Sequence, residues 1–297
     1  MQAHCDVHQR LHESDPAAFA RVAPRIVAIA AGGESKVGAA LMEQLPALKI
    51  ISVMGVGYDG IDVAAAKARG VVVTHTPGVL DDDVADLAIA LMLAVSRQIA
   101  RADRYVRAGD WAAKGALALG RKMSGARLGI VGIGRIGQAI ATRAVAFNMS
   151  VAYTARSART ALPYAFHPTP AALAAASDYL VVITPGGAAT RKLIDAEVLK
   201  ALGPQGCLVN VARGSVVDEA ALIEALQDGT IAGAGLDVFE AEPNVPAALR
   251  AMDNVVLTPH IGSATAQTRR AMAELAFANL HAQLEGRPLL TPVPECQ

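Results

Sequence analysis

The stretch that decides the fold reads LGIVGIGRIG and runs from Leu128 to Gly137. Its first four residues form an apolar run, expected to be a buried strand, and a helical pattern follows over Ile136–Phe147. A strand, a Gly-x-Gly-x-x-Gly string and a helix in this order are the context of a dinucleotide-binding fingerprint. Gly132 permits the tight turn, Gly134 lets a pyrophosphate approach the helix N-terminus, and Gly137 lets helix and strand pack closely. The alternative is an ordinary strand–helix turn with three glycines.

Outward from this stretch, short apolar runs alternate with alanine-rich helical segments along most of the chain. Most of these runs are continuously apolar, as in parallel strands covered on both faces. The alternation predicts the α/β class, with doubly wound, Rossmann-like parallel sheets. The expected strands are Arg25–Ala30, Leu48–Val53, Val71–Thr74, Leu128–Val131, Val151–Tyr153, Tyr179–Ile183, Gly206–Val211, Gly233–Val238 and Asn254–Leu257.

Two long helical stretches, Asp81–Arg107 and Ala264–Leu284, bracket the second series of strands. This arrangement predicts a discontinuous organisation with two domains and a ligand cleft between them. Residues 1–96 plus 269–297 are expected to form a substrate-binding domain. Residues 97–268 are expected to form a dinucleotide-binding domain inserted into the first.

Composition narrows the functional classes. The 297 residues are 53% hydrophobic and 18% charged, and their formal net charge is zero. This balance argues against a broad surface for nucleic acid or anionic membranes, which needs clustered positive charge. Three cysteines lie far apart without metal-ligand spacing, so we expect reduced thiols and no metal site. The N-terminus lacks a signal-peptide pattern, and the apolar run Leu87–Val95 is too short for a membrane span, so a cytoplasmic protein is expected.

The segment after the second strand of the fingerprint unit predicts the type of cofactor. NAD-binding folds place a carboxylate about 20 residues beyond the glycines, on the ribose 2′-hydroxyl. Here no Asp or Glu occurs between Val151 and Asp178, and Arg156, Ser157 and Arg159 stand at the expected place. Arginine and serine side chains suit phosphate oxygens, so NADP(H) is the preferred cofactor, with NAD(H) as the alternative. These arginines also fit a solvated loop.

Three residues near the ends of expected strands suggest a site for a carboxylate-bearing carbonyl compound. Arg213 follows one strand, and its guanidinium suits a substrate carboxylate. His260 follows the last strand and is the type of general acid that carbonyl reduction needs near neutral pH. Glu242 is a candidate to hold the other imidazole nitrogen and to favour the charged imidazole. Each of the three also has an alternative interpretation as a structural, capping or surface group.

At these residues the chain resembles the D-isomer-specific 2-hydroxyacid dehydrogenase family, and within it the glyoxylate/hydroxypyruvate and hydroxyphenylpyruvate reductases. The resemblance extends from about Val7 to Val293, and the joint order of its motifs is specific. The matching strings besides the glycine fingerprint are Gly55–Asp59, Asp83–Ala88, Val211–Gly214, Leu236–Pro243 and Pro259–Ser263.

The resemblance implies that Arg213, Glu242 and His260 are catalytic. It implies that Arg213 and the backbone N–H groups at Val56 and Gly57 bind the substrate carboxylate. It further implies that His260, the remaining substrate-binding residue, donates the proton and pairs with Glu242. It also implies a homodimer formed mainly through the cofactor domain, with the connection Gly109–Lys122 long enough to reach a partner. The residues expected at the cofactor are Gly132, Gly134, Arg135, Ile136, Gly137, Arg156, Ser157, Arg159, Thr184, Val211, Asp237 and Gly262, with Asp237 at the nicotinamide carboxamide.

The leading hypothesis is therefore an NADPH-dependent reductase of glyoxylate or hydroxypyruvate. A reductase of hydroxyphenylpyruvate or another bulkier 2-oxo acid is the same-class alternative. A non-catalytic NAD(P)-sensing regulator is the alternative from another class. One departure concerns the first domain: its first strand-like segment is Cys5–Gln9, whereas family members usually have an additional strand and helix before this position. Two alternatives are open: the first domain lacks an edge strand, or the sequence starts downstream of the original start.

Overall fold

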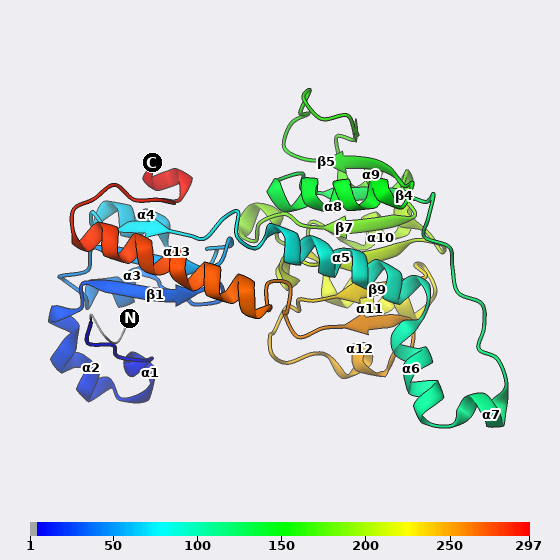
Figure 1. The fold of residues 1–297 in the computed structure, drawn as a ribbon, viewed down its shortest axis with the longest axis horizontal. Helices are drawn as coiled ribbons and strands as arrows, with labels where there is room; N and C mark the ends of the chain where they lie inside the picture. Colours follow the sequence, from blue (N-terminus) through cyan, green and yellow to red (C-terminus); the bar gives the residue numbers. More distant parts are fainter. Residues whose placement is uncertain (1–4) are drawn as a thin grey trace. The chain divides into compact units, whose positions relative to one another are not determined.

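The computed structural model describes residues 5–297 and divides them into two compact units, each described here by itself (Figure 1). Unit 1 comprises the described part of Met1–Leu80 together with Ala266–Gln297, and unit 2 is Asp81–Thr265. Residues 1–4, the start of the segment without a signal-peptide pattern, lie outside the described residues. Among residues 5–297, no helix combines the length and apolarity needed to cross a bilayer.

Unit 2 contains a seven-stranded parallel sheet in the order β10-β9-β8-β7-β4-β5-β6. From β4 the chain runs outward to β6, then returns to β7 on the other side of β4 and continues to β10. The order therefore reverses between β4 and β7, which is the switch point of a doubly wound fold. The strands are β4 (Arg127–Val131), β5 (Ser150–Thr154), β6 (Ala165–Phe166), β7 (Tyr179–Val182), β8 (Cys207–Asn210), β9 (Gly233–Leu236) and β10 (Val255–Leu257).

These strands confirm the doubly wound fold expected for this half of the chain. Strands β4 and β7 to β9 are completely buried apart from Arg127, which explains their continuous apolar sequence. The two-residue strand β6 was not expected, because a strand of that length leaves no alternating pattern. The helices of unit 2 are α5 (Asp81–Ser96), α6 (Ile99–Arg107), α7 (Asp110–Lys114), α8 (Arg135–Ala146), α9 (Pro170–Ala175), α10 (Ala196–Leu202), α11 (Glu219–Gln227) and α12 (Ala247–Ala251).

Side-chain caps explain where several of these helices begin. Thr169 accepts the N–H of Ala172 before α9, and Asp195 accepts the N–H of Val198 before α10, at 3.1 and 3.0 Å. Such caps satisfy N–H groups that have no partner inside a first helical turn.

The long helix expected over Asp81–Arg107 is in fact two helices. Gln98 adopts a left-handed backbone with φ 52°, which ends α5 and turns the chain into α6. Neither glycine nor proline stands at this break, so the sequence carries no signal for it. Helix α5 packs against α8 and against strands β8 and β9, and it therefore belongs to unit 2. The observed units thus divide at residue 80 rather than at residue 96, and at 265 rather than 268.

Unit 1 is built on three parallel strands in the order β1-β2-β3, namely β1 (Ala28–Gly32), β2 (Ile50–Met54) and β3 (Val72–Thr74). Helix α13 (Ala266–Leu284) packs against β2, where the Ser52 hydroxyl donates to the carbonyl of Ala276 at 3.0 Å. The shorter helices of unit 1 are α1 (Leu11–Ser14), α2 (Pro16–Val22), α3 (Ala39–Glu43) and α4 (Val63–Ala68).

The prediction of a strand-like segment over Cys5–Gln9 is wrong. These residues form no strand, and α1 begins shortly after them. Residues 5–10 are exposed, so no neighbouring strand or apolar surface is present to hold them in a sheet.

Candidate active site

The glycine fingerprint lies at the switch point of the unit 2 sheet, between the end of β4 and the start of α8. Gly132 has φ 101°, a backbone conformation that side chains disfavour. A Cβ on Gly137 would lie 2.2 Å from the Gly132 carbonyl oxygen, so only glycine lets α8 pack this close. A Cβ on Gly134 would meet nothing within 4 Å, which leaves open space beside the helix N-terminus. These features fit a bound pyrophosphate.

The other expected cofactor residues of this region line the same edge of the sheet. Thr184 follows β7, and its N–H lies 3.0 Å from the position of a Cβ on Gly132. Val211 follows β8 and is buried, with its N–H on the Val182 carbonyl at 3.2 Å. Within α8, Ile136 is half-buried, whereas Arg135 is exposed and its Nε donates to Asp81 at 2.9 Å.

The arginine pair follows β5 and is exposed. Arg156, Ser157 and Arg159 all face solvent, and within residues 5–297 neither guanidinium has a carboxylate at ion-pair distance. The Arg159 N–H donates to the Tyr153 hydroxyl at 2.6 Å, which fixes the backbone of this loop. The guanidinium groups are thus available to an anion at the end of β5.

The next carboxylate along the chain, that of Asp178, lies at the opposite end of the strands, where their amino ends are. Asp178 precedes β7 and accepts two hydrogen bonds from the Arg127 side chain, at 2.7 and 3.2 Å, and one from its N–H at 2.8 Å. Arg127 begins β4, so this pair joins the amino ends of two parallel strands. Asp178 therefore cannot take the place of the ribose-binding carboxylate at the carboxyl ends.

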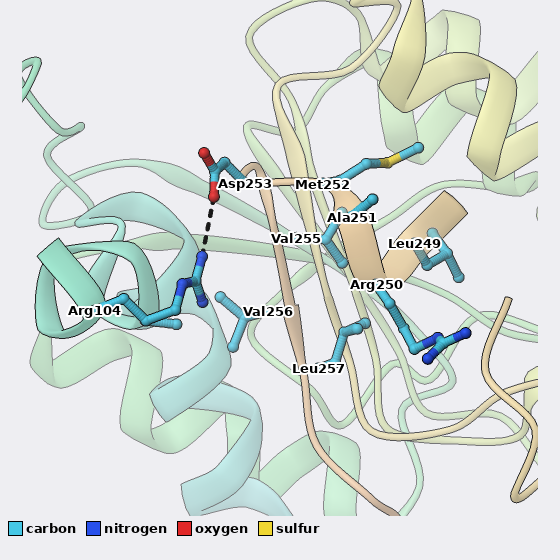
Figure 2. A pocket seen from close by; sticks show the side chains of 10 residues that line it. Arg104, Leu249, Arg250, Ala251, Met252, Asp253, Val255, Val256 and Leu257 are labelled. Carbon is cyan, nitrogen blue, oxygen red and sulfur yellow. Dashed lines mark hydrogen bonds and ion pairs between the residues drawn. The ribbon is translucent and has the colours of Figure 1, made fainter. Parts of the chain in front are cut away.

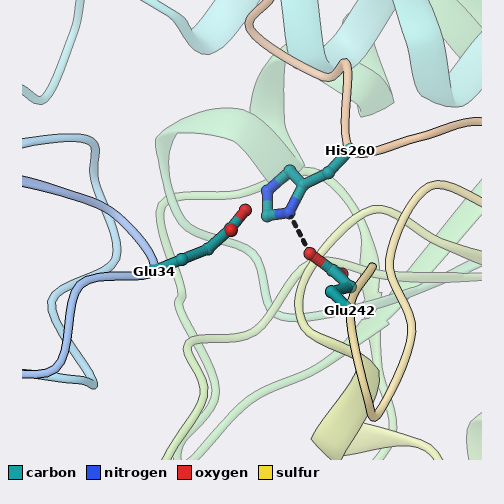
Figure 3. A group of neighbouring side chains, drawn as sticks. All are labelled: Glu34, Glu242 and His260. Carbon is teal, nitrogen blue, oxygen red and sulfur yellow. Dashed lines mark hydrogen bonds and ion pairs between the residues drawn. The ribbon is translucent and has the colours of Figure 1, made fainter. Parts of the chain in front are cut away.

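His260 and Glu242 meet directly in unit 2 (Figure 3). The imidazole Nδ1 lies 2.8 Å from Glu242 Oε2, and the N–H of Phe239 donates to the other oxygen, Oε1, at 2.8 Å. Burial alone would raise the pKa of Glu242. The hydrogen bonds from His260 and Phe239, with the charges of His260 and Arg213, outweigh burial and hold that pKa below its ordinary value. A carboxylate therefore faces the imidazole, favouring its protonated form.

Asp237 holds the loop that carries His260. Its side chain is 1% exposed and accepts the Thr258 hydroxyl at 2.7 Å and the N–H groups of Ile261 and Gly262 at 2.8 Å each. The Asp237 carbonyl also accepts the His260 N–H at 2.9 Å. Burial raises the pKa of Asp237 despite these donors. The four bonds hold His260 in a left-handed conformation of φ 51°. A further contact of Asp237 to nicotinamide stays a prediction.

Arg213 follows β8 and stands beside a close backbone crossing. Asn210 Nδ2 donates to the Arg213 carbonyl at 3.0 Å, and one guanidinium nitrogen donates to the Ala212 carbonyl at 2.7 Å. A Cβ on the next residue, Gly214, would lie only 1.9 Å from the Phe239 carbonyl carbon. Gly214 thus allows the loop that bears Glu242 to approach the Arg213 turn.

The remaining predicted substrate residues, Val56 and Gly57, lie in unit 1 directly after β2 and are half-buried. Their position at the carboxyl end of a parallel strand suits ligand binding. Sequence reasoning did not single out Thr258 or the Phe239 N–H, which hold Asp237 and Glu242. The only signal for Thr258 is its place two residues before His260.

A separate pocket of about 350 Å³ lies between α6, α12 and β10 (Figure 2). Leu249, Val255 and Leu257 supply apolar walls, and Arg104 pairs with Asp253 at its rim at 3.0 Å. None of the predicted site residues lines it, so it is not the site described above.

The comparisons with known proteins agree with this geometry. Residues 89–262 match the model of the D-isomer specific 2-hydroxyacid dehydrogenase, NAD binding domain. The chain is 48% identical to hydroxyphenylpyruvate reductase of Plectranthus scutellarioides, over 91% of this chain and 86% of that protein. It is 48% identical to glyoxylate/hydroxypyruvate reductase A of Arabidopsis thaliana, over 90% and 85% of the two chains.

A solved structure extends the likeness to three dimensions. The NADPH-dependent glyoxylate/hydroxypyruvate reductase of Sinorhizobium meliloti, in complex with NADP and malonate, matches with a TM-score of 0.89. The two are 49% identical, and the match covers 94% of this chain and 86% of that one. With the fingerprint at the switch point and the histidine–glutamate pair in place, the chain belongs to the D-isomer-specific 2-hydroxyacid dehydrogenase family.

Proposed function

We propose that this protein reduces small 2-oxo acids, glyoxylate and hydroxypyruvate above all, to 2-hydroxy acids with NADPH. The observation that carries the proposal is the 2.8 Å contact between His260 and an ionised Glu242. This contact supplies a positioned proton donor in a chain whose glycine fingerprint lies at the switch point of the unit 2 sheet.

In this reaction bound NADPH supplies the hydride that the carbonyl carbon accepts. Negative charge then develops on the carbonyl oxygen, and protonated His260 gives its Nε2 proton to that oxygen. The proton on Nδ1 stays in the hydrogen bond to Glu242, which fixes the ring and stabilises its charge. Arg213 and the N–H groups of Val56 and Gly57 bind the substrate carboxylate, so that the carbonyl is oriented for both transfers.

The preference for NADPH rests on the loop after β5. Arg156 and Arg159 offer guanidinium groups for a 2′-phosphate, while Asp178 is held by Arg127 at the other edge of the sheet. Ser157 adds a hydroxyl for the same phosphate.

The proposed activity is tested by following NADPH oxidation with a panel of glyoxylate, hydroxypyruvate and hydroxyphenylpyruvate. We expect turnover with at least one of the first two. Turnover with hydroxyphenylpyruvate alone would favour the bulkier-substrate alternative, which the likeness to hydroxyphenylpyruvate reductase keeps open. Binding of NADPH without turnover of any 2-oxo acid would instead identify a non-catalytic regulator.

We also propose a homodimer formed through unit 2. The segment that leaves α5 carries large apolar side chains in solvent, including Val106, Trp111 and Leu119, which are 57%, 64% and 95% exposed. Apolar side chains at this density suit a protein partner. The cytoplasmic location stays a prediction from the three separate cysteines, which are free thiols in the structure.

A further inference from the structure

We propose that His75 is a positioning residue for the substrate carboxylate, acting through the backbone of the Val56–Gly57 loop in unit 1. The inference rests on the proposed function, in which the N–H groups of Val56 and Gly57 bind that carboxylate. It adds a residue that contacts neither substrate nor cofactor.

His75 holds the loop by one hydrogen bond whose direction is unambiguous. Its Nδ1 lies 3.1 Å from the Val56 carbonyl oxygen. A carbonyl oxygen can only accept, so the proton must reside on Nδ1. The ring also packs edge-on against Tyr58, with 5.5 Å between ring centroids and 89° between ring planes. The imidazole is therefore fixed on the back of the loop.

Because a peptide unit is planar, the hydrogen bond to the Val56 carbonyl also fixes the N–H group of the same peptide unit. In a trans peptide the C=O and N–H groups are coplanar and point in opposite directions. Since His75 holds the Val56 carbonyl, it also orients the Gly57 N–H away from the ring. The N–H of Thr76 likewise donates to the Gly55 carbonyl at 2.8 Å and so orients the Val56 N–H. His75 and Thr76 thereby direct the successive N–H groups of Val56 and Gly57 away from themselves. Successive N–H groups that point in one direction form an arrangement that binds anions.

The C-terminal segment holds His75 in turn. The His75 N–H donates to the Thr291 carbonyl at 3.1 Å, and the Thr291 hydroxyl donates to the His75 carbonyl at 2.6 Å. Asn279 on α13, which is fully buried, donates to the Thr291 hydroxyl at 2.8 Å and accepts the Thr291 N–H at 3.1 Å. The backbone of His75 is thus fixed on both sides, and the ring reaches Val56 from a rigid support.

The test compares His75→Phe, which keeps a ring without a donor, with His75→Asn. The Asn amide nitrogen is as many bonds from Cβ as Nδ1, so it restores the donor. His281→Phe is the matched control, because His281 is a half-buried histidine of α13 that pairs with Glu285. In His75→Phe, KM for hydroxypyruvate should rise about three- to tenfold, the ratio expected for one net hydrogen bond. KM for NADPH and Tm should stay near the parent values, and both His75→Asn and the control should resemble the parent.

Three results would overturn the inference. The first is an unchanged KM for hydroxypyruvate in His75→Phe, and the second is a lower Tm in this variant together with a rise in KM for both hydroxypyruvate and NADPH. The third is a KM for hydroxypyruvate in His75→Asn that is as high as in His75→Phe. Hydrogen–deuterium exchange of a peptide spanning Ser52–Gly60 separates this inference from the proposed function. If the parent reduces no 2-oxo acid, the proposed function fails, but faster exchange in His75→Phe than in His75→Asn still supports the positioning role. Equal exchange in both variants and the parent would then refute it.

Discussion

At the scale of single residues, the two carboxylate oxygens of Glu242 have different hydrogen-bond partners. One oxygen accepts the Phe239 N–H and fixes the side chain, and the other faces His260. Because the pKa of Glu242 is held below its ordinary value, the carboxylate stays ionised through the neutral range. The pair of Glu242 and His260 therefore stabilises the fold at neutral pH. This contribution to the free energy of unfolding is lost as the pH falls through the lowered pKa of Glu242.

Replacing Glu242 with Gln should shift the pH profile of the reduction. Since Glu242 is already ionised near neutrality, the decline of kcat/KM at higher pH reports loss of the His260 proton. Removing the neighbouring negative charge makes that proton easier to lose, so the decline should begin at lower pH in Glu242→Gln. The control is Glu240→Gln, because Glu240 pairs with Arg191 instead. A profile that does not move would show that Glu242 leaves the protonation of His260 unaffected.

His260→Ala should lower kcat by about 10²–10⁴-fold, the usual effect of removing a general acid. KM for NADPH should change little, because the glycine fingerprint is untouched. Steady-state kinetics with hydroxypyruvate measure both quantities, with His281→Ala as the control histidine. Turnover near the parent level in His260→Ala would contradict the proposed mechanism.

At the scale of elements, the loop after β5 is the part of the sheet edge where the cofactor preference is expected. Arg156→Ala should lower kcat/KM for NADPH about tenfold to a hundredfold, since a charge-assisted hydrogen bond contributes about 1.5–3 kcal/mol. The kcat/KM for NADH should stay near that of the parent, because NADH has no 2′-phosphate for Arg156 to bind. Arg191→Ala, which removes a guanidinium already paired with Glu240, is the control. Equal efficiency of the two cofactors in the parent would exclude the preference.

The crossing of the Gly214 turn and the Phe239 loop is a second testable contact between elements. Gly214→Ala would place a methyl group 1.9 Å from the Phe239 carbonyl carbon, so the loop that bears Glu242 must shift. We expect a loss of about 1–3 kcal/mol in unfolding free energy, typical of overpacking, together with reduced kcat. Gly38→Ala is the control, because a Cβ there meets nothing within 4 Å and φ is an ordinary −93°. Denaturant unfolding and kinetics measure the two effects. If Gly214→Ala equalled Gly38→Ala in unfolding free energy and in kcat, the predicted shift of the loop would be ruled out.

Most elements of the fold were predictable because buried parallel strands leave uninterrupted apolar runs. Strands β4 and β7 to β10 began and ended within a residue or two of the expected positions. The break at Gln98 was not predictable, since a left-handed glutamine depends on its surroundings rather than on its identity. The boundary at residue 80 followed from the packing of α5 on α8, a contact between segments that sequence periodicity does not reveal.

The predictability of the site was uneven for a similar reason. The types and order of Arg213, Glu242 and His260 indicated the chemistry, but their spacing in sequence could not show that the last two meet. The bonds from Asp237 to the His260 loop depend on the approach of β9 to β10, so their pattern appears only in three dimensions.

At the scale of the whole molecule, light scattering at micromolar concentration should give a mass twice that of the 30.6 kDa chain. Trp111→Glu and Leu119→Glu should each shift this mass toward the monomer, because a charge replaces an apolar side chain that we expect to be buried by the partner. Leu284→Glu is the control, since Leu284 is also exposed but belongs to unit 1. A monomeric parent protein would refute the dimer.

The division of the chain also sets an order for biosynthesis. Unit 2 is one continuous segment, so all of its residues have been made once Thr265 leaves the ribosome. Unit 1 needs α13, whose buried Met272, Ala276 and Leu280 complete its interior, and Val293, whose N–H pairs with the Val73 carbonyl at 3.0 Å. The N-terminal segment of unit 1 is made before unit 2 and must therefore wait for its partner α13 while the ribosome makes the whole of unit 2. During this interval the apolar surface of β2 that α13 later covers is exposed to solvent or chaperones.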